Sequence, residues 1–246
     1  MFRHKGRSRA YVHNLRLAAM LSFVAGVVNI SGVLSIKTLT TNETGHFAYF
    51  AEELVNRHYA TSFFFLLYIL SFLLGSFVSS VLIGFTSKIN PKIAHSGPMI
   101  IEIVVLALVA IFGTSLMLLN HGSQVIAYTL LFAMGMQNSL VTQVSQSTVR
   151  TTHLTGLFTD LGIELSQLFF YRNTQERKKL SKSIYLRFLI IVSFFTGCVL
   201  GGFLFSSFQL KTVLFASICL IVAFLYDNIR YRFYFFRRKL KSKPTA

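Results

Sequence analysis

Two short polar stretches carry most of the side chains that could do chemistry, and the two stretches resemble each other. One begins at Thr40 and the other at Thr151, and an offset of 111 residues aligns fifteen positions with seven identities. The identities are two leading threonines, a Thr-Gly pair, a phenylalanine and a closing Glu-Leu pair. Both stretches lie between long apolar segments, so the repeated polar residues are the first candidates for a site.

The Thr-Gly pairs, Thr44-Gly45 and Thr155-Gly156, indicate places where a helix is interrupted or closely approached. Glycine allows close backbone approach, and threonine can bond freed carbonyl groups. Interrupted helices paired across two repeats are typical of transporter sites near the middle of the membrane. Tight helix packing through small residues explains the same pattern without a ligand, so both interpretations stay open.

Glu53 and Glu164 are the repeated ionisable residues. His46 precedes Glu53, and Asp160 precedes Glu164, each on the same helical face as the glutamate that follows it. A carboxylate inside a membrane is most often used to handle protons or cations. The alternative is that both helices lie at the membrane surface, where water solvates the carboxylates.

Asn29 and Asn138 are repeated amides inside apolar segments. Such an amide either bonds across helices or contacts a substrate. Together with the polar stretches they complete the set of candidate substrate- or ion-binding residues: Asn29, Thr41, Thr44, Gly45, His46, Glu53, Asn138, Thr152, Thr155, Gly156, Asp160 and Glu164.

No enzyme motif accompanies these residues. The sequence contains no HExxH, G-x-S-x-G or phosphate-binding loop motif, and no metal-binding carboxylate cluster. We therefore expect no catalytic residue, no metal and no cofactor, and we expect that the protein is not an enzyme. The two cysteines, Cys198 and Cys219, both lie in apolar segments and are expected to pack as small apolar residues.

Composition places these stretches in a membrane protein. Hydrophobic residues make up 53% of the 246 residues and charged residues only 13%, about half of the fraction usual in soluble domains. The net charge of +16 is concentrated in the tails and one internal loop, a distribution that reflects membrane topology. Nucleic acid is not an expected partner, because aromatic and basic residues do not alternate as in a nucleic-acid groove.

The apolar segments predict an all-α, polytopic helical membrane protein. About 20 apolar residues are needed to cross the hydrocarbon core. Six segments qualify as transmembrane helices: Leu17 to Ile36, Tyr59 to Ser87, Pro98 to Leu119, Gln124 to about Val144, Phe188 to Leu210 and Thr212 to about Ile229. The two polar stretches predict further amphipathic helices, Thr40 to Asn56 and Thr151 to Tyr171, that are re-entrant or internal to the bundle.

The repeat extends beyond the polar stretches. The sequence from Phe23 to Asn29 resembles that from Phe132 to Asn138, and Leu66 to Gly75 resembles Phe188 to Gly197. We expect a single membrane domain over residues 1–246 with repeat 1 at about 15–119, repeat 2 at about 124–229, and basic cytoplasmic tails at 1–14 and 230–246. Six spans would make the repeats inverted, and eight would make them parallel. We favour six.

Positive charges fix the expected orientation. With six spans, all Lys and Arg residues except Lys37, Arg57 and Lys211 lie on one side of the membrane. Cytoplasmic loops carry the excess of positive charge, so both termini are expected in the cytoplasm of a multi-pass protein. The same tail placement results from eight spans.

Some of these residues resemble a known family. Gln137-Asn138 followed by Val149-Arg150-Thr151-Thr152 and then Thr155-Gly156 is similar to the YoaK family of bacterial integral membrane proteins, and the resemblance runs from Leu15 to about Tyr226. Many family members have Asp at the position of Asn29 and Asn at that of His46. The resemblance implies location in the bacterial cytoplasmic (inner) membrane and names no substrate.

The leading functional hypothesis is a small secondary transporter, or permease-like protein, with a polar site between the two repeats. The alternative is a non-transporting membrane protein, lipid-interacting or scaffold-like, whose Thr-Gly motifs only pack helices. The expected partners are the lipid bilayer and a small-molecule or ion substrate, and formation of a homo-oligomer stays open.

Overall fold

In the computed structural model, the chain is described over residues 11–91, 93–170 and 174–241, with side chains described up to residue 226. This part of the chain is all α-helical and contains no strand. Its elements are α1 (Tyr11–Ile36), α2 (Glu43–Val55), α3 (Tyr59–Ile89), α4 (Ser96–Leu116), α5 (Gly122–Ser145), α6 (Leu154–Phe170), α7 (Thr174–Phe208), the 3-10 helix η2 (Gln209–Lys211) and α8 (Thr212–Lys241). The ends of both predicted basic tails, residues 1–10 and 242–246, lie outside the described residues.

Five stretches of the described chain are long and apolar enough to cross a membrane. Four of them are the helices α1, α3, α4 and α5, and the fifth, Thr174–Tyr226, contains α7, η2 and the first half of α8. The polar helices α2 and α6 have only 13 and 17 residues and are not among the five. The protein is therefore a helical protein of multi-pass membrane type.

Two helix pairs form close crossings in the body of the molecule. A Cβ atom on Gly26 of α1 would overlap the carbonyl oxygen of Phe194 in α7, and one on Gly135 of α5 would overlap that of Phe72 in α3. Hydrogen bonds mark the same two crossings: Cys198 donates to the Gly26 carbonyl at 3.4 Å, and Ser76 donates to the Gly135 carbonyl at 3.0 Å. Helices α1 and α7 thus pack in the same way as α5 and α3.

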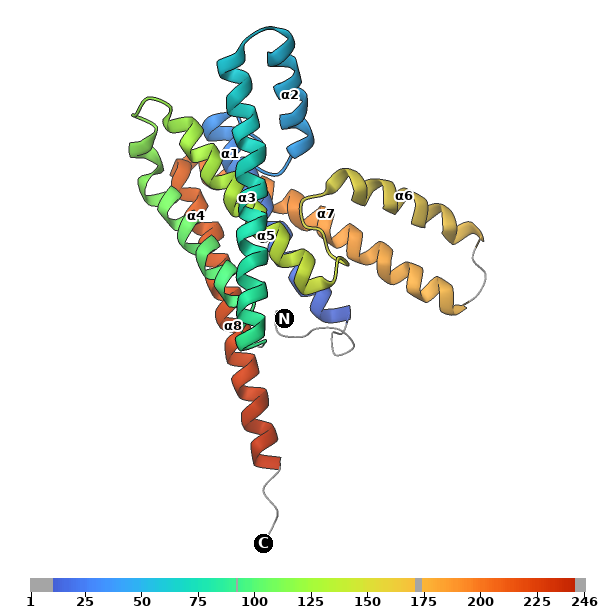
Figure 1. Cartoon of the computed structure of the whole chain (residues 1–246). Helices are drawn as coiled ribbons and strands as arrows, with labels where there is room; N and C mark the ends of the chain where they lie inside the picture. The colour runs from blue at the N-terminus through green and yellow to red at the C-terminus, as the bar shows by residue number, and fades with distance from the viewer. Residues whose placement is uncertain (1–10, 92, 171–173, 242–246) are drawn as a thin grey trace.

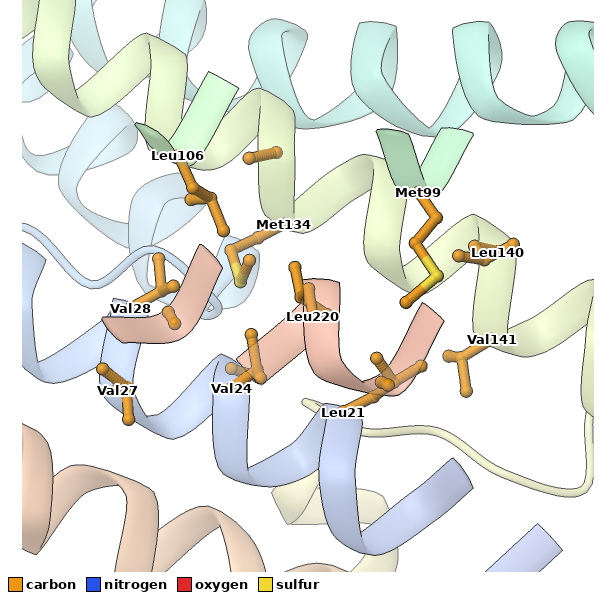
Figure 2. Close-up of a cluster of buried hydrophobic side chains, with 14 of the residues drawn as sticks. Leu21, Val24, Val27, Val28, Met99, Leu106, Met134, Leu140, Val141 and Leu220 are labelled. Carbon is orange, nitrogen blue, oxygen red and sulfur yellow. The ribbon is translucent and has the colours of Figure 1, made fainter. Parts of the chain in front are cut away.

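Helices α1 and α5 meet at the centre and run in opposite directions. The side chain of Gln137 in α5 donates to the carbonyl of Leu21 in α1, whereas Gly32, eleven residues later in α1, lies near Leu130, seven residues earlier in α5. Side chains of α4 and α8 close the core around this pair, as Figure 2 shows for Met99, Leu106 and Leu220.

The two polar helices form hairpins with the long helices that follow them. Helix α2 lies along the first part of α3, and α6 lies along the first part of α7. In Figure 1 the two hairpins point away from the body in different directions, and the starts of α2 and α6 lie where the hairpins diverge. This arrangement brings the two Thr-Gly segments close together although they are 111 residues apart in the sequence.

Candidate binding site

The candidate site is a cavity of about 680 Å³ between the starts of α2 and α6. Both polar stretches contribute to its wall, and α3 and α5 contribute one residue each. The lining residues are Thr41, Asn42, Glu43, Thr44, Gly45, Ala48, Phe72, Asn138, Thr152, His153, Leu154 and Thr155. The lining therefore offers hydroxyl, amide, imidazole and carboxyl groups and one phenyl ring.

The two repeated asparagines hold the segments that form this wall. The Oδ1 atom of Asn29 accepts hydrogen bonds from the backbone N–H of Thr40 at 3.0 Å and from the Thr41 hydroxyl at 3.1 Å. In the second half, Oδ1 of Asn138 accepts from the hydroxyls of Thr152 at 2.9 Å and Thr151 at 3.3 Å. Each asparagine thus fixes the loop that leaves its own helix, and the leading threonines of the repeat are its partners.

The packing at the start of each polar helix explains why a glycine stands in each Thr-Gly pair. Asn42 caps α2, since its Oδ1 accepts from the N–H of Gly45 at 3.1 Å. A Cβ on Gly45 would lie 2.9 Å from Nδ2 of Asn42, and one on Gly156 would overlap the imidazole of His153. The glycine of each Thr-Gly pair makes room for the side chain three residues before it, so the helices begin at these pairs and are not broken there.

Glu43 is the carboxyl group of the cavity. It begins α2, both of its carboxyl oxygens are buried, and neither has a hydrogen-bond partner among the described residues. Burial raises the pKa of Glu43 from 4.5 to about 8. Desolvation of the carboxylate is the cause of this shift, since the charged form is disfavoured away from water.

His46 lies behind the cavity wall and not in it. Its Nε2 donates to the Leu39 carbonyl at 2.7 Å, and its ring lies edge-on to Tyr68. Burial lowers the pKa of His46, and the bond to Leu39 partly opposes that effect. His46 lines a second, aromatic pocket of about 300 Å³ with Tyr49 and Phe65.

The second half has a pocket of about 380 Å³ in the corresponding place, but charged residues line it. Arg150, His153, Asp160 and Arg187 contribute to its wall, together with Gly156. The two pockets share their position relative to the Thr-Gly segments and differ in chemistry, one aromatic and the other charged.

The repeated carboxylates lie farther along their helices, outside the cavity. Glu53 pairs with His58 at 2.9 Å near the end of α2. Glu164 accepts from Arg187 at 2.9 and 3.0 Å and from Ser183 at 2.6 Å, while Asp160 accepts from Arg187 at 2.8 Å. In the second half these carboxylates join α6 to α7.

Six of the twelve candidate residues therefore line one cavity: Thr41, Thr44, Gly45, Asn138, Thr152 and Thr155. Asn29 supports it through Thr41, whereas His46, Glu53, Gly156, Asp160 and Glu164 lie elsewhere. The sequence reasoning missed Glu43, because its aligned partner is Leu154 and the repeat gave no signal there. Among the described residues, no group of three or more His, Cys, Asp or Glu side chains could hold a metal ion.

The five stretches long and apolar enough to cross a membrane place this protein in the class of helical, multi-pass membrane proteins. Within that class, residues 17–226 match a family described as "Protein of unknown function (DUF1275)", and the chain belongs to this family. Comparison with curated proteins and with solved structures found no match.

Proposed function

We propose that this protein is a small secondary transporter whose substrate binds in the cavity between the two Thr-Gly segments. The observation that carries the proposal is that residues 111 positions apart line a single cavity of about 680 Å³. This volume lies within the range of about 300–1,000 Å³ that is usual for small-molecule sites. Its hydroxyl and amide groups suit a small polar substrate.

The transporter is proposed to consist of two homologous halves. The contacts of one half recur in the other: Gly26 meets Phe194, and its aligned residue Gly135 meets Phe72, the residue aligned with Phe194. The bonds of Cys198 and Ser76, which are also aligned, support the same correspondence. Duplication of one ancestral unit accounts for these matched contacts.

The directions of the helices support six crossings and an inverted repeat. If α2 also crossed the membrane, four spans (α1, α2, α3 and α4) would precede α5, and α1 and α5 would run parallel. Without α2, three spans precede α5, and the two helices would run antiparallel. They run antiparallel, as six crossings require. The excess of Lys and Arg then supports a cytoplasmic location for both termini, and the YoaK-like residues support a bacterial inner membrane.

In this mechanism the halves rock about the cavity and expose it to each side of the membrane in turn. The hydroxyls of Thr44 and Thr155 hold the substrate, since they stand at corresponding places in the cavity wall. Asn138 positions that wall through its bonds to Thr151 and Thr152. Glu43 carries the coupled proton, because its raised pKa allows loading and release near neutral pH.

The test is transport by the purified protein in proteoliposomes, with solid-supported-membrane currents recorded across a panel of small polar solutes. Thr44→Val and Thr155→Val are expected to reduce flux at least tenfold, and Glu43→Gln to abolish its dependence on the proton gradient. Thr159→Val is the matched control, because its hydroxyl bonds to the Thr155 carbonyl on α6 outside the cavity. Flux that none of the three cavity variants changes would disprove the site.

A membrane protein that packs or scaffolds without transport is the competing function. The observation that favours it is that Asn29 and Asn138 are occupied by their own loops. Cysteines placed at Thr44 and Thr155, in a chain without Cys198 and Cys219, distinguish the two functions. Reaction with a water-soluble thiol reagent supports an aqueous cavity, and complete protection supports packing alone.

A further inference from the structure

A second buried carboxyl lies away from the cavity, in the core of the bundle. Glu102 of α4 is 0% exposed, and neither of its carboxyl oxygens has a hydrogen-bond partner. No ion pair involves it among the described residues. An ionised carboxylate without a partner is strongly disfavoured in such surroundings.

Glu102 of α4 and Gln137 of α5 are both fully buried, and their positions along the two helices align them in the core. Glu102 lies three residues after Met99 and four before Leu106, on the core-facing side of α4. Gln137 lies three residues after Met134 and three before Leu140. Figure 2 shows Met99 beside Leu140 and Leu106 beside Met134. Because Glu102 lies between Met99 and Leu106 on α4, and Gln137 lies between Met134 and Leu140 on α5, helix register aligns the two polar residues.

Gln137 supplies an acceptor to this part of the core and no free donor. Its Nε2 donates to the Leu21 carbonyl at 3.0 Å, and that bond fixes the orientation of the amide. The other amide atom, Oε1, is buried and has no donor. With Glu102 ionised, this part of the core would contain three acceptor oxygens and nothing to donate to them.

No described cation is placed to neutralise Glu102. Its own helix carries only His95 as another titratable group, at the N-cap of α4 and two turns away. Helices α5, α8 and α3 and the 3-10 helix η2 pack against α4, and α1 packs against α5 and α8. The titratable side chains of these elements among the described residues are Tyr128 of α5; Cys219 and Tyr226 of α8; Tyr59, Tyr68 and Lys88 of α3; Lys211 of η2; and Tyr11, His13 and Arg16 of α1. Lys88, Arg16 and Lys211 are exposed, and none of them pairs with Glu102.

We propose that Glu102 is a proton-binding site in which the bound proton joins the carboxyl oxygen of Glu102 to Oε1 of Gln137. The proton converts the carboxylate to a neutral acid whose O–H donates to the amide oxygen, so one proton satisfies an atom on each helix. Release of the proton to water leaves the negative charge unpaired and favours separation of α4 from α5. The inference does not rest on the proposed transport function.

The experiment is infrared spectroscopy of the full-length protein in lipid nanodiscs at neutral pH. Subtracting the Glu102→Gln spectrum from that of the wild type should reveal the C=O stretch of a protonated, hydrogen-bonded carboxylic acid. Gln137→Leu should move that band to the higher frequency of a free acid, because the acceptor is lost. Glu53→Gln is the control, since that partly exposed carboxyl pairs with His58 and should give no such band.

Labelling of the wild type with dicyclohexylcarbodiimide, which attacks protonated carboxyls in apolar surroundings, requires no variant. Mass spectrometry should locate the adduct at Glu102 at neutral pH, with labelling lost as the pH is raised. Carboxylate bands in place of the C=O stretch, absence of the adduct, or a C=O band that Gln137→Leu leaves unmoved would each overturn the proposal.

Discussion

Asn29 and Asn138 each hold the start of a polar helix through one amide oxygen. Each oxygen accepts two hydrogen bonds from the threonines that begin the repeated stretch. Asn29 is 8% exposed, so its bonds compete little with water. The repeated amides thus position the cavity wall, and in the second half Asn138 also lines it.

Replacing either asparagine by alanine should release its loop. Asn29→Ala leaves the buried N–H of Thr40 without an acceptor, so we expect the free energy of unfolding to fall by about 1–3 kcal/mol. Thermal unfolding in detergent, followed by circular dichroism, measures the change. Ser206→Ala, which removes an exposed hydroxyl bonded to its own helix, should stay within about 0.5 kcal/mol of the wild type.

Glu43 should make stability depend on pH in a defined direction. The pKa of Glu43 in the folded protein is about 8, above the ordinary value of 4.5, so between these values the folded state holds a proton that the unfolded state has released. Stability is therefore expected to fall as the pH rises through this window. Glu43→Gln should flatten that dependence, raise the melting temperature at alkaline pH and change it little below pH 4.5. A parallel decline in both proteins would contradict the assignment.

At the scale of elements, two glycine-lined crossings fix how the long helices meet. At each crossing, both helices contribute a glycine that faces a backbone carbonyl of the other helix. The two backbones therefore approach as closely as small residues allow. Since lipid gives little hydrophobic drive for association, this close packing supplies much of the attraction between spans.

Alanine at one of these glycines should force the helices apart. We expect Gly75→Ala to destabilise the protein by about 1–3 kcal/mol or more, because its Cβ would overlap the Phe132 carbonyl. Gly84→Ala is a matched control on the same helix, since nothing lies within 4 Å of its Cβ. Equal melting temperatures for the two variants would show that the crossing is looser than described.

At the scale of the whole molecule, the antiparallel course of α1 and α5 supports the proposal that the halves form an inverted pair. The chain leaves α1 at one end of the bundle and α5 at the opposite end, and the loops that follow bring the starts of α2 and α6 to one cavity. A site shared in this way can be opened from either end by movement of one half.

This arrangement predicts which side of the membrane each hairpin faces. A cysteine at Arg57 should react with an impermeant thiol reagent from outside intact cells, and one at Lys178 only after the membrane is permeabilised. The chain used for labelling lacks Cys198 and Cys219. Reaction of both positions from the same side would indicate eight crossings and parallel halves.

The apolar segments were sufficient to predict the helical class. The two Thr-Gly segments could be expected to lie near each other, because their repeated polar residues can be aligned within an otherwise apolar chain. The sequence could not place Glu53 in three dimensions. At 1.5 Å per residue, nine residues separate Glu53 from Thr44 by about 13 Å along α2, which takes it out of the cavity. The position of Glu102, one turn after Pro98, suggested a carboxyl at the headgroup level, whereas the packing of α5 and α8 against α4 buries it in the core.

The crossed pairing of α1 with α7 and of α3 with α5 has a consequence for biosynthesis. A nascent chain that has delivered only its first four helices to the membrane still lacks the partners of both α1 and α3. Neither half can complete its packing before translation of the other, so a truncated product should be a substrate for quality-control proteases. Under the proposed duplication, an ancestral gene that encoded a single half would have needed to insert copies in both orientations to make the same packing.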